Sequence, residues 1–258
     1  MILAHRVDGD PEGLPLLMIH PLGADQGFWD ECRRHFGPGI KAVSCDLRGS
    51  GASPDLSEPL SLATSVADVE RLRGHLGLEK IVLIGCAVGG MAAASYAANH
   101  ADRAHALVIS NPGIRVTAAG AENLRQRAAT VRRSGMVALL PAAIENAFFG
   151  YYDSQMRRQY EAGFIGQKPE NYAFATLGAA QSDIAADCRK VGCPVLLVPG
   201  DNDRLFRREH TEEIAANIPQ AKVKAFAKGA HFIPYQQPVE FAGTVMNFLK
   251  ETRLAHKL

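Results

Sequence analysis

The sequence predicts an α/β fold, a mostly parallel and doubly wound sheet covered by helices on both faces. Short β-rich runs alternate with segments of helical periodicity, and this alternation is typical of parallel strands joined by helices. One strand, a sharp turn and a helix follow one another directly over residues 80–95. A chain of 258 residues with 47% apolar residues is also long enough for one large core with a modest insertion.

The strands of this sheet are expected at residues 16–20, 41–47, 80–85, 106–110 and 194–200, with a last one near 222–226. Between the second and third strands, apolar residues recur at steps of three or four and predict an amphipathic helix. They are Leu62, Val66, Val69, Leu72 and Leu76. A closing helix is predicted over 238–253, because Pro238 is well suited to a first helical turn.

Residues 115–190 have a different composition from the rest. They are rich in Ala, Arg, Gln and Tyr, and glycines and prolines divide them into several short helices. We expect a helical lid here, inserted after the fifth or sixth strand of a core formed by residues 1–114 and 191–258. Its aromatic residues either line a pocket or pack against the core, and Phe148 is our candidate for substrate contact.

Composition narrows the classes of partner. A formal charge of +1 provides no strong field for nucleic acid or for an anionic membrane. The five cysteines are odd in number, which favours reduced thiols in a cytoplasmic protein. No apolar run approaches membrane-spanning length, and the first residues lack the pattern of a secretion signal. We therefore expect a cytoplasmic protein with a small-molecule partner and without a metal, nucleotide or flavin cofactor; its oligomeric state stays open.

Residues 85–89 read Gly-Cys-Ala-Val-Gly and have the spacing of a nucleophile elbow, Gly-x-Ser-x-Gly. In such a turn the central side chain projects above the sheet. Here the central residue is Ala87, whose methyl group cannot attack a carbonyl carbon. Cys86 is one position too early, so we expect it to point away from the site and to pack as a small apolar group.

An acid and a base occupy the positions where this arrangement needs them. Asp203 follows an apolar strand, and His231 follows the last predicted strand. In triad logic the carboxylate orients the imidazole, and the imidazole moves protons. Asp201 is the rival acid, but the first aspartate after a strand more often stabilises the turn.

The loop of residues 20–23 follows the first predicted strand, where backbone N–H groups face a developing oxyanion. We assign Leu22 and Val88 as the donors from their positions. His20 is a candidate for substrate contact or for holding this loop. Among lid arginines, Arg132 is our candidate for binding a substrate carboxylate through paired hydrogen bonds.

The turn at residues 46–53 combines an acid, a base and hydroxyl groups. We interpret it as structural, with Asp46 and Arg48 tying loops together, since the spacing does not fit a phosphate-binding loop.

Over nearly its whole length the chain resembles the α/β-hydrolase superfamily, and within it 3-oxoadipate enol-lactonases. The resemblance is carried by His-Pro-Leu-Gly at 20–23, Phe-Trp-Asp at 28–30, the turn at 46–53, the elbow with Gly-Gly-Met at 89–91, the stretch 127–136 and Gly-Ala-His at 229–231. It implies an α/β-hydrolase fold and cofactor-free hydrolysis of a small lactone, ester or related acyl compound through an acyl-enzyme. Ala87 departs from the family's serine, although similar aminoacrylate hydrolases can carry alanine there.

Four functional hypotheses remain open at this point. The chain is a hydrolase inactivated by alanine in place of serine, which removes about six orders of magnitude in turnover. Alternatively, it is a natural serine-less hydrolase in which His231 activates water toward a labile enamine or amide. A ligand-binding protein without catalysis and a cofactor-free oxygenase are the remaining alternatives.

Overall fold

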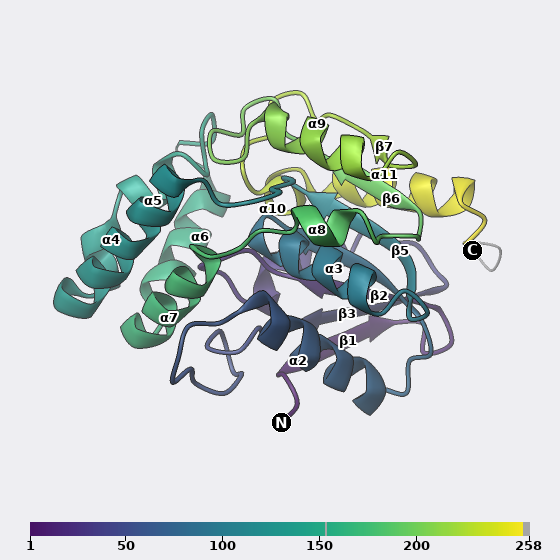
Figure 1. The fold of residues 1–258 in the computed structure, drawn as a ribbon, viewed down its shortest axis with the longest axis horizontal. Helices are drawn as coiled ribbons and strands as arrows, with labels where there is room; N and C mark the ends of the chain where they lie inside the picture. Colours follow the sequence, from purple (N-terminus) through teal and green to yellow (C-terminus); the bar gives the residue numbers. More distant parts are fainter. Residues whose placement is uncertain (153, 255–258) are drawn as a thin grey trace.

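The computed structural model describes residues 1–152 and 154–254, and in them one central sheet is covered by helices on both faces (Figure 1). The described residues form seven strands in the order β1-β3-β2-β4-β5-β6-β7. All neighbouring strands are parallel except β1, which runs antiparallel to β3. The strands are β1 (His5–Gly9), β2 (Leu14–Ile19), β3 (Ile40–Cys45), β4 (Ile81–Cys86), β5 (Ala104–Ser110), β6 (Val195–Val198) and β7 (Lys222–Val223).

The two edge strands are where the sequence prediction failed or was inexact. The prediction omitted β1, because an edge strand with four exposed residues has no apolar run to announce it. At the opposite edge, β7 is two residues long rather than the five predicted. The predicted α/β architecture and its mostly parallel sheet are confirmed.

Alternate residues of the inner strands lie in two separate apolar layers, because successive side chains of a strand point to opposite faces of the sheet. Leu16 and Met18 lie in the layer under α1 (Asp30–Arg33) and α11 (Pro238–Glu251). Leu17 and Ile19 lie in the opposite layer. The helices of that second layer are α2 (Leu62–His75), α3 (Val88–Asn99), α8 (Ala185–Cys188) and α9 (Arg208–Asn217).

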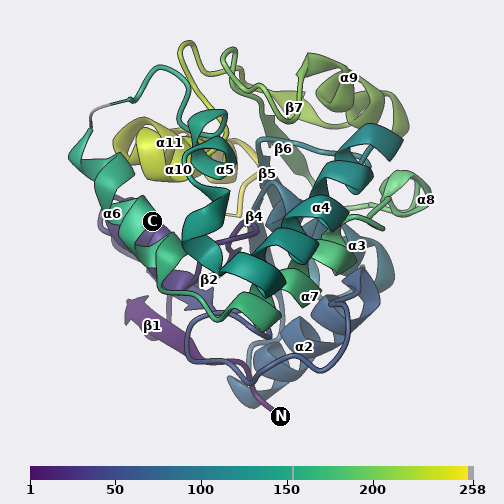
Figure 2. The ribbon, with the colours of Figure 1, turned by 90° about the vertical axis from the view of Figure 1, so that its left-hand side faces the viewer.

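A group of helices lies between β5 and β6 in the chain and to one side of the sheet, on the left of Figure 1 and facing the viewer in Figure 2. We call them the inserted helices: α4 (Ala118–Ser134), η2 (Met136–Leu139), α5 (Ala142–Glu145), α6 (Gln155–Ile165) and α7 (Pro169–Ala179). Side-chain oxygens of Thr117 and Ser154 cap the first turns of α4 and α6. Helices α4 and α7 pack against each other.

After the inserted helices the chain returns to the sheet. Helix α8, at the end of the segment predicted as a lid, packs against α3. A 3-10 helix, η1 (Gln26–Trp29), and a short helix, α10 (Ile233–Gln236), complete the described elements. No helix in the described part of the chain is both long and apolar enough to cross a lipid bilayer.

Candidate active site

The turn between β4 and α3 has the geometry of a nucleophile elbow without the nucleophile. Ala87 joins the two elements with φ +51° and ψ −117°, a conformation that residues with a side chain rarely adopt. A Cβ atom on Gly89 would collide with the carbonyl oxygens of Ile19 and His20, so glycine there lets the loop after β2 approach the turn. The methyl group of Ala87 lines a cavity.

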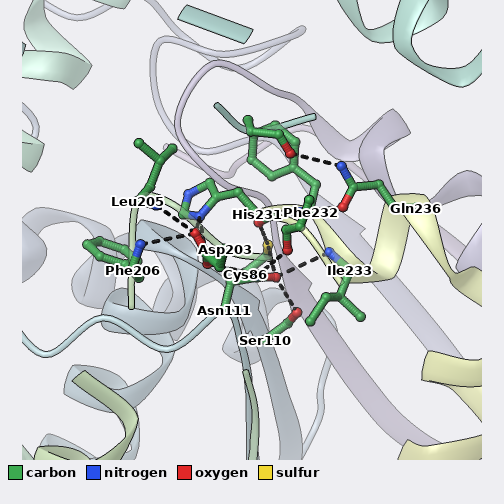
Figure 3. Close-up of polar contacts among 12 residues, drawn as sticks. Cys86, Ser110, Asn111, Asp203, Leu205, Phe206, His231, Phe232, Ile233 and Gln236 are labelled. Carbon is green, nitrogen blue, oxygen red and sulfur yellow. Dashed lines mark hydrogen bonds and ion pairs between the residues drawn. The ribbon is translucent and has the colours of Figure 1, made fainter. Parts of the chain in front are cut away.

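Asp203 and His231 meet beside this turn, as Figure 3 shows. Both carboxylate oxygens of Asp203 lie 2.9 Å from His231 Nδ1. The backbone N–H groups of Leu205 and Phe206 donate to Asp203 Oδ1 at 2.8 and 3.1 Å. The rival acid Asp201 is exposed, so the structure pairs His231 with the second aspartate of the loop.

The surroundings of Asp203 favour its ionised form. Burial opposes ionisation, but nearby His231 and the hydrogen bonds from His231, Leu205 and Asn111 outweigh it and hold the pKa of Asp203 below its ordinary value. An ionised Asp203 accepts the proton on Nδ1 of a neutral His231, which leaves the Nε2 lone pair available as a base. His231 lines the same cavity as Ala87.

The two predicted oxyanion donors also lie at this cavity. Leu22 comes from the loop after β2, and Val88 is the first residue of α3. Within the described residues, neither backbone N–H has a hydrogen-bond acceptor. The first N–H groups of a helix have no partner inside the helix, so Val88 can donate to a negative charge that develops near Ala87.

The cavity has a volume of about 670 Å³ and lies between the elbow and the inserted helices. Three aromatic residues of α6 and α7, Tyr160, Phe164 and Tyr172, line it. Among the described residues of its lining, no side chain is acidic, and Arg127 is the one with a permanent positive charge. Arg127 is half-buried and lies beside the hydroxyl group of Tyr172.

The residues predicted to touch substrate, His20, Arg132 and Phe148, all lie outside the lining of this cavity. Arg132 is outside the cavity lining, because it forms paired hydrogen bonds with Glu170 and lies over the ring of Phe174. Phe148 is fully buried behind the cavity, where its ring packs against other aromatic residues.

The structure also assigns His20 to its loop rather than to the cavity. Its Nδ1 donates to the Pro21 carbonyl, and its Nε2 accepts from the N–H of Leu47. Burial outweighs the nearby carboxylates and lowers the pKa of His20, which keeps the ring neutral as these two bonds require. Both ring nitrogens are thus occupied.

Two further predictions are confirmed. Cys86 is fully buried, and burial raises the pKa of its thiol well above the ordinary value, so it is no substitute nucleophile. Asp46 accepts N–H bonds from Gln26 and Ala52, and Arg48 is paired with Asp68, so the turn at 46–53 ties loops together.

Two residues at the site, Arg127 and Asn111, are not among the candidates predicted from the sequence. Asn111 Nδ2 donates to Asp203 Oδ2 at 3.0 Å. Helical periodicity alone would have separated Arg127 from Arg132. Asn123, Arg127 and Thr130 are four and three residues apart on α4, and all three line the cavity. Asn111 carries no comparable pattern.

The parallel sheet, the elbow and the Asp203–His231 pair together define an α/β-hydrolase. The chain belongs to the serine aminopeptidase S33 family, whose model matches residues 16–236. The predicted superfamily resemblance is therefore confirmed.

Individual relatives cover nearly the whole chain. The chain is 26% identical to a putative carbamate hydrolase, RutD, from a Caulobacter species, over 96% of this chain and 95% of the relative. It is 23% identical to 3-oxoadipate enol-lactonase 1 of Acinetobacter baylyi, over 96% and 93%. Among solved structures, a thermophilic esterase from Thermogutta terrifontis is 28% identical with a TM-score of 0.89, over 97% of this chain and 93% of that one.

Proposed function

We propose that this protein hydrolyses a small acyl compound, a lactone, ester or carbamate, with water that His231 activates. The observation that carries the proposal is a complete Asp203–His231 pair at a cavity in which a methyl group stands at the position of the nucleophile. The names of the relatives support the choice of acyl compound, since they include an enol-lactonase, an esterase and a putative carbamate hydrolase.

The proposed reaction needs only groups present in the chain. The oxygen of a water molecule attacks the acyl carbon while His231 Nε2 takes the proton. The N–H groups of Leu22 and Val88 stabilise the oxyanion of the tetrahedral intermediate. As the carbon–oxygen or carbon–nitrogen bond breaks, His231 returns the proton to the leaving group, and the products are an acid and an alcohol, enol or amine.

Energetics restrict the substrates. A general base contributes about two to four orders of magnitude, which is small beside covalent catalysis by a full triad. A serine-less hydrolase therefore favours substrates whose leaving group departs readily, such as an enol-lactone or a labile enamide. An ordinary alkyl ester is a poor substrate by this route.

The positive charge of Arg127 in the cavity further limits the class of substrate. Arg127 has no acidic neighbour in the described lining, so we propose that it binds a carboxylate on the substrate. The substrate would then place its acyl carbon near Ala87 and its carboxylate toward α4.

The competing mechanism is covalent, with the present chain as a form disabled at position 87. The strained backbone of Ala87 favours it as a second candidate, because a water mechanism does not need a side chain held at φ +51°.

One comparison of variants separates these mechanisms. Turnover of the protein, Ala87→Ser and His231→Ala is measured on enol-lactones, activated esters and labile enamides, with and without oxygen. We expect turnover by the unmodified protein and a loss of about 100-fold or more in His231→Ala. Turnover by Ala87→Ser alone would instead support the covalent route, and oxygen-dependent turnover would support oxygenation. Inactivity of both the unmodified protein and Ala87→Ser on every compound would favour a binding protein.

A further inference from the structure

Asn111 is a fully buried polar residue at the centre of the candidate site. It directly follows Ser110, the last residue of β5, and has φ +53°. Asparagine accepts this left-handed conformation more readily than most residues, but a buried one still needs partners for its amide group. The conformation turns the chain at the carboxyl end of β5 and brings the amide between two loops.

Both amide donations go to those loops, and Figure 3 shows Asn111 beside Asp203 and His231. Asn111 Nδ2 donates to Asp203 Oδ2 at 3.0 Å and to the carbonyl oxygen of Ala230 at 2.7 Å. Ala230 immediately precedes His231. One planar group therefore bonds both to the acid and to the backbone beside the base, although Asp203 and Ala230 are 92 and 119 residues away in the chain.

The side-chain oxygen of Asn111 also has hydrogen-bond partners. Asn111 Oδ1 accepts from Ser110 Oγ at 2.8 Å and from the N–H of Ile233 at 3.2 Å, and the Cys86 thiol lies 3.7 Å away. These partners orient the amide so that its N–H groups, rather than its oxygen, face Asp203. The chain thus anchors the amide from the strand that carries the elbow, from β5 and from α10.

We infer that Asn111 is a positioning residue for the Asp203–His231 pair, a role that rests on the proposed function for its effect on turnover. Its two donations hold the carboxylate plane of Asp203 toward Nδ1 and hold the loop of His231 at a constant distance from it. Without them, Asp203 Oδ2 retains only the bond with His231, and the carboxylate gains freedom to rotate about its Oδ1 bonds to the backbone. Small displacements of a reacting group cost large factors in rate.

Asn111→Gly is the variant that isolates the amide, because glycine adopts φ +53° without strain. Ser110→Ala is the matched control: it is equally buried and removes one donor to the same amide oxygen, while both donations by Asn111 remain. Two readouts are needed, one of which does not depend on turnover. The first is the NMR resonance of the His231 Nδ1 proton with the titration of the ring. The second is kcat and KM on a compound of the proposed panel that the unmodified protein turns over.

In Asn111→Gly we expect the Nδ1 resonance to shift or broaden by exchange and kcat to fall by about 10- to 100-fold, with KM changed by less than about threefold. Ser110→Ala should show a much smaller change in both. An unaltered Nδ1 resonance and titration in folded Asn111→Gly would overturn the inference, even if the variant were less stable. Because this readout needs no substrate, the inference can fail while the proposed function holds, or the reverse.

Discussion

Ala87 has a backbone conformation that is costly for any residue with a side chain. Conformations of this kind cost about 1–3 kcal/mol, whereas glycine loses about 0.5–1 kcal/mol through its greater freedom in the unfolded chain. We therefore expect Ala87→Gly to raise the free energy of unfolding by about 1 kcal/mol, measured by chemical denaturation. The small methyl group of Ala87 contributes little packing energy to offset this gain.

The control for this prediction is Ala93→Gly in the interior of α3. Ala93 is also buried but lies in a helix, where glycine is less favourable than alanine by about 1 kcal/mol. The two substitutions should change stability in opposite directions. A similar loss in both variants would show that the turn at Ala87 stores no strain.

Among single residues, the sequence predicted those whose place after a particular strand marks them as catalytic candidates. Asp203 and His231 follow particular strands, so their order in the sequence predicts their partnership. Asn111 acts through contacts with residues more than 90 positions away, and nothing local in Ser110-Asn111-Pro112 indicates them. Arg132 is predicted as the carboxylate ligand because the sequence shows a pair of basic residues at 132–133 but not the partner Glu170 across the helices.

Between elements, the contact of α2 with α3 includes a half-buried polar link. The Tyr96 hydroxyl donates to Glu70 Oε2 at 2.6 Å, and Arg73 donates to both oxygens of Glu70. The hydrogen bonds from Arg73, opposed by partial burial and supported by Tyr96, lower the pKa of Glu70 from 4.5 to about 2. The link is thus strongest while Glu70 is ionised.

This link predicts a pH dependence of stability. Because the folded pKa lies below the unfolded value, the stabilisation is fully present above pH 4.5 and is lost as the pH falls toward about 2. We expect Glu70→Gln to lower the free energy of unfolding at pH 7 by about 2 kcal/mol, after allowance for solvent screening, and to have little effect near pH 2. Denaturant titrations over this pH range measure the difference.

Glu122→Gln on α4 is a suitable control, since Glu122 is exposed and its ion pair with Arg125 is worth little. An equal effect of Glu70→Gln at pH 7 and at pH 2 would mean that the carboxylate charge does not stabilise the contact between the helices.

The inner strands, which are buried on both faces, and two amphipathic helices were the elements that the sequence predicted well. The strands β2 to β6 and the helices α2 and α11 lie within a few residues of their predicted bounds, because burial imposes an apolar pattern on them. Strand β1 was not predicted, because this edge strand consists mostly of exposed residues and so has no apolar pattern.

For the whole molecule, the candidate site depends on two parts of the chain that meet over the cavity. The sheet provides Ala87, Asp203 and His231, and the inserted helices cover them. The parts are joined at the base itself: the carbonyl oxygen of Ala147 accepts the backbone N–H of His231 at 3.2 Å and the side-chain amide of Gln236 at 2.9 Å. Only the packing of these two parts shows which face of α4 meets the cavity.

That packing leads to a prediction about substrate charge. If Arg127 binds a substrate carboxylate in the half-buried wall of the cavity, Arg127→Gln removes a charge-assisted hydrogen bond worth about 1.5–3 kcal/mol. The KM for a carboxylate-bearing substrate should then rise about 10- to 100-fold, while that for its neutral methyl ester or amide analogue changes little. Arg132→Gln is the matched control on the same helix, because Arg132 is occupied by Glu170 outside the cavity. Equal losses on charged and neutral substrates, or a stronger effect of Arg132→Gln, would place the recognition of the carboxylate elsewhere.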